Sequence, residues 1–180
     1  MWKLFIFISK ILSMMPKPLF RFFWRLLDIF DGKFGALLRY LLIAKRLKNC
    51  GTRVYFGPSV YIESPHKLAL GNNVSIHHQC TLICSGEIEI HDDVSIAHSS
   101  SIVSTNHTWE DLEVAIKYNP VVGNRVIIKK DVWVGCGVRI LAGVIIPSRS
   151  IIAAGAVVTK NLTDTGSLYG GIPAKKIRDI

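Results

Sequence analysis

At 180 residues the chain is long enough for one domain with a buried core and a short appendage. Its formal net charge of +9 is unevenly placed, because residues 1–50 hold ten lysines and arginines against two aspartates and so carry all but one unit of it. These cations are mixed with large apolar side chains, a combination that suits a lipid surface and argues against nucleic acid. The four cysteines form neither a disulfide framework nor a CxxC zinc pattern, so we expect reduced thiols and no metal site.

The N-terminal segment predicts three helices, at residues 2–15, 19–30 and 34–47. The first is almost entirely apolar and is ended by Pro16 and Pro18. The second is amphipathic, because Arg21, Arg25 and Asp28 form a narrow polar stripe at helical spacing on an otherwise aromatic stretch.

This segment is better suited to lie on a membrane than to cross one. As a helix, residues 2–15 would reach roughly 21 Å, short of the roughly 30 Å hydrocarbon core, and Lys10 would sit near the middle. No A-x-A-like cleavage site follows, which disfavours a signal peptide. We therefore predict that residues 1–50 form a basic amphipathic helical segment and that residues 1–47 bind an anionic membrane surface. The alternative is that the helices only pack on the rest of the chain or at a subunit contact.

Residues 51–180 are predicted to form one repeat domain. Branched apolar residues recur at every sixth position, at Val122, Ile128, Val134, Ile140, Ile146, Ile152 and Val158. Small or branched residues follow four positions after each, at Val126, Val132, Val138, Val144, Ser150 and Ala156. A period of six is divisible by two, so both positions of a short strand point inward, as in a parallel β-helix.

Earlier hexads extend this pattern toward the N-terminus, at Phe56, Ile62, Leu68, Leu70, Ile76, Leu82, Ile90, Ile96 and Ile102. Two slips interrupt them, between Leu68 and Leu70 and around Cys84–Glu87. At about three hexads per turn the chain makes four to five coils, and residues 162–180 are expected to cap them. The largest break lies at residues 103–119, a loop too long for a coil corner, and His107 stands at its start.

Three motifs carry a resemblance to the hexapeptide-repeat acyltransferases, whose polysaccharide and galactoside O-acetyltransferase branch is the most similar. They are Asp131–Gly137 (DVWVGCG), Ala153–Lys160 (AAGAVVTK) and Gly170–Lys175 (GGIPAK). The likeness extends over residues 54–178 and implies a mainly β fold, a left-handed parallel β-helix; this handedness comes from the resemblance alone.

The resemblance further implies a homotrimer with active sites between neighbouring β-helices, acetyl-CoA as the donor, and a loop histidine as general base. His107 matches that histidine. A neutral imidazole takes the proton of an attacking hydroxyl and returns it to the CoA thiolate, so that transfer is direct. A backbone N–H near Gly135 is expected to stabilise the oxyanion. Glu110 or Asp111 is a candidate to orient His107.

By the same resemblance, the donor is expected to contact Trp133, Gly135, Cys136, Ala154, Thr159, Lys160, Lys175 and Arg178, the cations meeting the CoA phosphates. The acceptor is expected to contact His77, His78, Gln79 and Asn106. Gln79 stands where the sugar-acetylating branch carries an asparagine, which leaves the acceptor open.

Together these features predict an acetyl-CoA-dependent O-acetyltransferase that modifies a hydroxyl of a cell-surface polysaccharide precursor linked to a lipid, at the inner face of the cell membrane. Two alternatives remain open. One is N-acetylation of a nucleotide-linked amino sugar, since a loop histidine serves amines similarly. The other is a β-helix that acts as a scaffold without catalysis.

Overall fold

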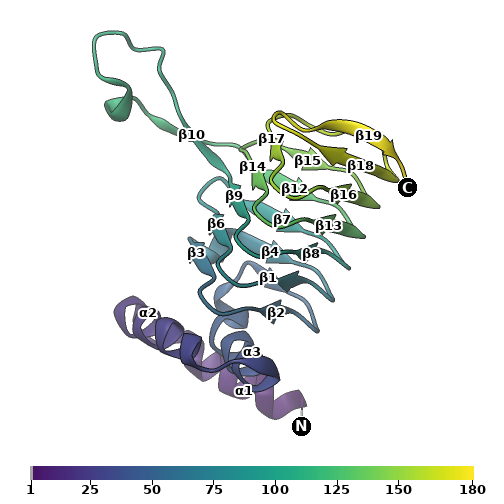
Figure 1. The fold of residues 1–180 in the computed structure, drawn as a ribbon. Coiled ribbons are helices and arrows are strands. Elements are labelled where there is room, and N and C mark those ends of the chain that lie inside the picture. The colour runs from purple at the N-terminus through teal and green to yellow at the C-terminus, as the bar shows by residue number, and fades with distance from the viewer. Residues whose placement is uncertain (1) are drawn as a thin grey trace.

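The computed structural model describes residues 2–180, with side chains from residue 7 onward. Its body is a three-sided parallel β-helix that stands on a helical base (Figure 1). Face A is the sheet β1 (Asn49–Cys50), β4 (Leu68–Leu70), β7 (Ile88–Ile90), β12 (Val126–Ile128) and β15 (Ile145–Ile146). Face B is β2 (Tyr55–Phe56), β5 (Ser75–Ile76), β8 (Ser95–Ile96), β13 (Val132–Val134), β16 (Ser150–Ile152), β18 (Ser167–Gly170) and β19 (Lys175–Asp179). Face C is β3 (Tyr61–Glu63), β6 (Thr81–Ile83), β9 (Ser101–Val103), β14 (Arg139–Ile140) and β17 (Val157–Val158).

Three edges join these faces, and two of them matter for function. The chain passes from face B to face C along the BC edge, at residues 57–60, 77–80, 97–100, 135–138 and 153–156. It passes from face C to face A along the CA edge, at residues 64–67, 84–87, 104–125 and 141–144. The strands on each face pair in parallel, apart from the antiparallel pair of β18 and β19 that closes the last coil.

The predicted hexads are confirmed as the core of this β-helix. Ile128, Val134 and Ile140 are fully buried, as are their equivalents in the earlier coils at Ile76, Ile96 and others. The slips arise because Tyr55 pairs with Ser75, twenty residues on, whereas Arg139 pairs with Val157, only eighteen residues on. Counted between inward residues, the two extra positions fall between faces C and A, because Ile62 precedes Leu70 by eight residues whereas Ile140 precedes Ile146 by six. In the first coil this stretch includes the 3-10 turn η3 (Pro65–Lys67).

The first predicted hexad position, Val122, is wrong. Val122 is 40% exposed and belongs to β11 (Val121–Gly123), which runs antiparallel to β10 (Thr105–His107). These two strands and the 3-10 turn η4 (Ile116–Tyr118) form an arm, residues 104–125, that projects from the CA edge (Figure 1). Val122 pairs with Asn106 in this arm, so the coil pattern resumes only at the buried Val126.

The three predicted helices are confirmed. The helical base consists of α1 (Trp2–Ser13), α2 (Lys17–Leu26), η1 (Leu27–Ile29), α3 (Gly32–Ile43) and η2 (Ala44–Arg46). Within the described residues no helix combines the length and hydrophobicity that crossing a bilayer requires.

The helical base covers the open end of the first coil by replacing the hydrogen bonds of a missing coil. In the body, the N–H of Gly57 donates to Ile76 O and the N–H of Tyr61 donates to Cys80 O. The equivalent carbonyls of the first coil have no strand below them; Arg39 Nε donates to Phe56 O at 2.8 Å and Trp24 Nε1 donates to Val60 O at 2.8 Å.

On the same edge, the Asp28 carboxylate accepts a 2.6 Å hydrogen bond from the N–H of Ser59. At the equivalent position one coil higher, the N–H of Gln79 donates to Pro58 O. Helical side chains thus satisfy backbone groups that an uncovered β-sheet edge would leave open.

Candidate active site

The arm presents His107 to solvent. His107 ends β10, pairs with Val121 of β11 and is exposed. The next residue fixes the base of the arm, since both the N–H and the hydroxyl of Thr108 donate to Pro120 O, at 2.9 and 3.0 Å. Asn119 is buried within the arm, and its side chain makes two hydrogen bonds to the backbone of Asp111. Its oxygen accepts from the N–H of Asp111 and its nitrogen donates to Asp111 O, both at 3.1 Å. The imidazole is therefore held on a locally ordered hairpin away from the body.

The two acidic residues considered as partners of His107 are used elsewhere in the arm. The Glu110 carboxylate accepts from the N–H of Trp109 at 3.0 Å, and the Asp111 carboxylate accepts from the N–H of Glu113 at 3.0 Å. Among the described residues, neither carboxylate hydrogen-bonds to His107. A carboxylate that orients this imidazole would have to come from another molecule or from a rearranged arm.

Three of the four predicted acceptor residues, His77, His78 and Gln79, lie on the BC edge, where equivalent positions stack from coil to coil. The fourth, Asn106, lies on the arm. The N–H of Ser99 donates to His78 O, that of Gly137 donates to His98 O and that of Gly155 donates to Cys136 O. This register puts His78, His98, Cys136 and Ala154 in one line, which we call the BC column. The rings of His78 and His98 stack in parallel, with centroids 4.9 Å apart and an interplanar angle of 4°.

His98 is a residue that the sequence reasoning missed. It follows His78 by twenty residues, the repeat length of these coils, and that spacing is the signal that would have found it. The ring of His77 lies beside that of Tyr55 from face B, with centroids 5.5 Å apart. Burial, and then repulsion from His78 and His98, lower the pKa of His77 below the value of 6.5 for a free imidazole. Gln79 accepts from the hydroxyl of Ser99 at 3.3 Å.

The predicted donor residues fall near both edges. Trp133 is 55% exposed on the outer surface of β13, next to Gly135 and Cys136 on the BC edge. The fold itself requires a glycine at position 135, because a Cβ there would lie only 2.7 Å from Ala154 N in the backbone of the next coil. Its N–H already donates to Ile152 O at 2.8 Å, so the expected oxyanion contact does not come from Gly135 itself.

Thr159 and Lys160 follow β17, where the chain turns away from face C, on the side that carries the arm. Lys175 and Arg178 lie on β19, opposite Gly170 and Leu168 of β18, and are exposed. Lys160, Lys175 and Arg178 make no ion pair within the described part of the chain, whereas Lys176 is bound to Asp179 and Asp164 at 2.7 and 3.4 Å. Three cations near the last coil are thus open to an anionic ligand.

A single copy of the chain does not bring the predicted residues into one site. The BC column lies on one edge, while His107, with Asn106 beside it, lies on an arm that leaves the CA edge. Face C separates the two edges (Figure 1).

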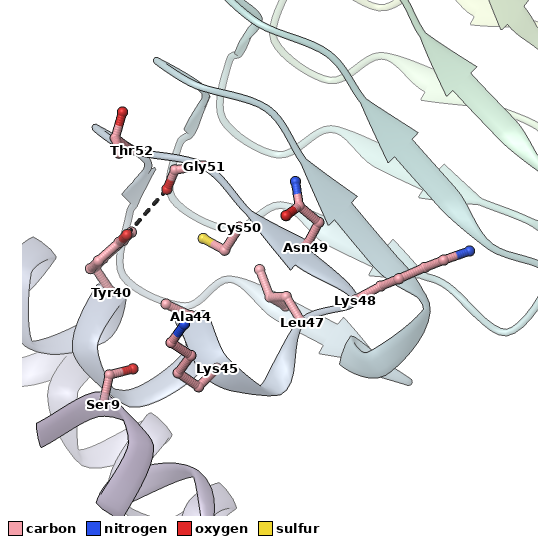
Figure 2. A pocket seen from close by; sticks show the side chains of 10 residues that line it. All are labelled: Ser9, Tyr40, Ala44, Lys45, Leu47, Lys48, Asn49, Cys50, Gly51 and Thr52. Carbon is pink, nitrogen blue, oxygen red and sulfur yellow. Dashed lines mark hydrogen bonds between the residues drawn. The ribbon is translucent and has the colours of Figure 1, made fainter. Parts of the chain in front are cut away.

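A cavity of about 360 Å³ at the junction of the helical base with the first coil offers no alternative site (Figure 2). Tyr40, whose hydroxyl donates to Gly51 O at 3.1 Å, and Cys50 line it. Burial raises the pKa of the Cys50 thiol to about 12, so it remains protonated and a poor nucleophile at neutral pH. None of the predicted site residues lines this cavity.

Stacked hexad coils with a long arm inserted at one edge define the class of this protein as a hexapeptide-repeat β-helix. No model of a protein family matches the chain. It is, however, 29% identical over 145 residues to the putative acetyltransferase YJL218W of Saccharomyces cerevisiae, covering 77% of this chain and 69% of that protein. It is 28% identical over 143 residues to the galactoside O-acetyltransferase of Escherichia coli, covering 79% of this chain and 68% of that protein.

Solved structures agree with these relatives. The hexapeptide-repeat acetyltransferase VCA0836 of Vibrio cholerae, complexed with acetyl coenzyme A, superposes with a TM-score of 0.76 at 25% identity, covering 87% of this chain and 82% of that one. The sequence relatives and the solved structures together support the hexapeptide-repeat acyltransferase family for this chain. The N-acyltransferase AntD of Bacillus cereus shares the fold at a TM-score of 0.60 and 22% identity, covering 77% of this chain and 87% of that one.

Proposed function

We propose that the protein is an acetyl-CoA-dependent O-acetyltransferase that modifies a saccharide hydroxyl with His107 as general base. The observation that carries the proposal is the exposed His107 on a projecting arm in a β-helix of this family. Its donor is proposed from the relative that binds acetyl coenzyme A, and its saccharide acceptor from the relative that acts on a galactoside.

In the proposed reaction, a ring nitrogen of His107 accepts the hydroxyl proton as the oxygen attacks the thioester carbonyl. The carbon–sulfur bond then breaks, and the imidazolium returns its proton to the thiolate of CoA. Charge on the carbonyl oxygen is stabilised by backbone donors of the BC edge other than Gly135. Lys160, Lys175 and Arg178 meet the phosphates of the donor, a task that suits exposed cations without partners of their own.

The proposed assembly is a homotrimer in which the arm of one protomer lies against the BC edge of another. It would join His107 to the BC column, which a single protomer keeps apart. It would also cover the exposed outer side of Trp133 on face B.

His107→Ala tests the chemistry. It should lower acetyl transfer by about 10²–10⁴-fold, the usual contribution of a general base, with CoA binding and oligomeric state unchanged. The matched control is His91→Gln, because His91 lies off both edges that carry the predicted residues and is bonded to Glu89. A panel of sugars and amino sugars shows whether oxygen or nitrogen is acylated. Near-normal turnover by His107→Ala would remove this residue from the mechanism, and failure of the wild type to bind CoA in calorimetry would revive the scaffold alternative.

We further propose that the helical base holds the enzyme on the anionic inner face of the cell membrane. One face of α2, formed by Leu19, Phe22, Phe23 and Leu26, is exposed although it is apolar. Phe7 and Ile11 of α1, and Met14 just after it, are likewise exposed at helical spacing. A soluble monomer seldom leaves contiguous apolar surface of this kind uncovered. Basic residues beside such a surface favour anionic lipid.

Substitution tests this better than deletion, because removing residues 1–47 would also uncover the core residue Phe56. Phe22→Ser combined with Phe23→Ser should weaken binding to phosphatidylglycerol vesicles by about tenfold or more, from the loss of buried aromatic area. Leu112→Ser in the arm, which removes another exposed apolar side chain, is the control. Equal vesicle binding by the double variant and the control would contradict the membrane assignment.

A further inference from the structure

A basic groove lies where the helical base meets face C. Its volume is about 540 Å³, and it is lined on one side by α2 and η2 and on the other by β3 and the first turn of the CA edge. Five cations line it: Lys17, Arg21, Arg25, Lys45 and Arg46. The single carboxylate in the lining, Glu63, accepts a 2.6 Å hydrogen bond from the hydroxyl of Ser85. The groove therefore has a strong excess of positive charge.

Most of this charge is not used by the fold. Arg46 is committed, because it stacks over the ring of Phe20 at 4.4 Å and donates to Leu12 O near the end of α1 and to Met15 O just beyond that helix. The other four cations make no ion pair in the part of the chain that the structure describes. Several unpaired cations around one hollow are complementary to a group with more than one negative charge, such as a phosphate or diphosphate.

The walls of the groove add apolar surface to this charge. Phe20, Trp24 and Tyr61 line it, and Trp24 is held in place by its hydrogen bond to Val60 O. On the next face of α2 lie Leu19, Phe22, Phe23 and Leu26, the surface proposed above to enter the membrane. A ligand with a phosphate head and a long hydrocarbon tail would satisfy both surfaces, whereas a free phosphate would satisfy only the cations.

The groove also lies on the edge that carries the arm. At the CA edge the hydroxyls of Ser64, in the groove lining, and Ser85, one coil above, are 3.1 Å apart. Ser104 follows in the next coil, where its hydroxyl accepts from the N–H of Gly86, and the arm begins there. Two coils correspond to a rise of roughly 10 Å, so a sugar attached to a phosphate in the groove extends toward the arm of His107. Figure 1 shows α2, β3, β6, β9 and β10 following one another along this side of the molecule.

We infer that this groove binds the phosphate or diphosphate of a long-chain membrane lipid that carries the saccharide acceptor. The inference rests on the proposed function and specifies its acceptor class. The cations hold the phosphate, the outer face of α2 lies among the lipid chains, and the saccharide is directed along the CA edge toward the arm.

The test compares two kinds of phosphatidylcholine vesicle. One contains a polyprenyl phosphate and the other contains phosphatidylglycerol, in amounts that give both membranes the same negative charge. We expect the wild type to bind the polyprenyl phosphate vesicles about tenfold more tightly or better. Arg21→Gln combined with Arg25→Gln should abolish that preference, since two cations near a membrane contribute about 30-fold in affinity. Lys10→Gln combined with Lys33→Gln removes the same charge from exposed positions outside the groove and should preserve it.

Equal binding of the wild type to both membranes would overturn the inference, as would loss of the preference in both double variants. Displacement of the protein from polyprenyl phosphate vesicles by low millimolar inorganic phosphate would show a site for free phosphate and would also overturn it. Lys17→Gln, at the exposed start of α2, repeats the test should the arginine variant fold poorly. CoA calorimetry on the same proteins separates the two proposals, because absence of CoA binding refutes the acetyltransferase and leaves the lipid preference measurable.

Discussion

Arg39 provides the sharpest test of how the helical base is joined to the β-helix. Its side chain is fully buried, and it donates to three carbonyl oxygens, those of Phe56 at 2.8 Å, Leu27 at 2.7 Å and Phe30 at 3.1 Å. None of its partners is a carboxylate. Arg39→Met keeps much of the packing volume but removes every one of these donors.

The cost follows from the groups left behind. Leu27 O retains the N–H of Phe30 at 3.2 Å, but the oxygens of Phe56 and Phe30 lose the hydrogen bonds from Arg39. Each buried polar group left without a partner costs about 1–3 kcal/mol, so the sum is about 2–6 kcal/mol. Removing a buried charge whose Nη2 has no partner offsets part of this sum. We expect a net loss of about 3 kcal/mol, which corresponds to a fall in Tm of about 6–12 °C.

Urea unfolding followed by tryptophan fluorescence measures this loss, with Trp24 reporting on the junction. Lys33→Met is the control, because Lys33 is exposed on the first turn of the same helix. A free energy of unfolding for Arg39→Met within about 0.5 kcal/mol of the wild type, the usual range for surface substitutions, would refute the idea that Arg39 replaces a missing strand.

Three further predictions concern the BC edge. Gly135→Ala should lower both stability and CoA affinity, measured by melting and calorimetry, because its Cβ would approach Ala154 N at 2.7 Å and Ile152 O at 2.8 Å, both rigid backbone atoms; an unchanged protein would mean that the coils separate easily. The folded pKa of His77 lies below 6.5, so its contribution to stability is present above that pH and is lost as the pH falls through the folded pKa. His77→Gln should therefore flatten the acid side of a plot of urea midpoint against pH, and an unaltered slope would contradict this. His98→Ala removes the ring stacked on His78 and should raise the KM for the saccharide more than it lowers kcat, whereas equal effects would point to a role in the chemical step.

The repeat core was predictable because its signal is local and redundant. Each hexad repeats the same requirement, an inward branched residue such as Ile140 or Ile146, and an error at one position leaves the others intact. Val122 was misassigned because the returning strand of the arm happens to match the phase of the coils, and only the antiparallel pairing with Asn106 distinguishes it. His98 was missed because its neighbour lies twenty residues away, a distance that matters only once the coil length is known.

The way in which the helical base covers the first coil could not be predicted from the sequence, for a different reason. Trp24, Asp28 and Arg39 serve backbone atoms of Val60, Ser59 and Phe56, and no pattern in the chain shows which carbonyls will lie at the end of a β-helix. The site itself was only partly predictable. Apart from His98, the residues of the BC column were named through a resemblance, and their separation from His107 depends on which edge the arm leaves.

The surfaces of α2 argue that the helical base does more than cover a strand edge. Phe20 and Trp24 are four residues apart on one face of α2 and pack against the core of the β-helix, where Trp24 meets Phe56 edge to face with centroids 6.1 Å apart. A helix that only covered the coil would need no second apolar face, yet Leu19, Phe22, Phe23 and Leu26 form one. Lys17, Arg21 and Arg25 lie between the two faces and line the groove. A basic stripe between a protein-facing and an exposed apolar surface is the arrangement expected at a membrane interface. There the exposed apolar surface contacts the lipid hydrocarbon chains, the basic stripe contacts the lipid phosphates, and the remaining face contacts the protein.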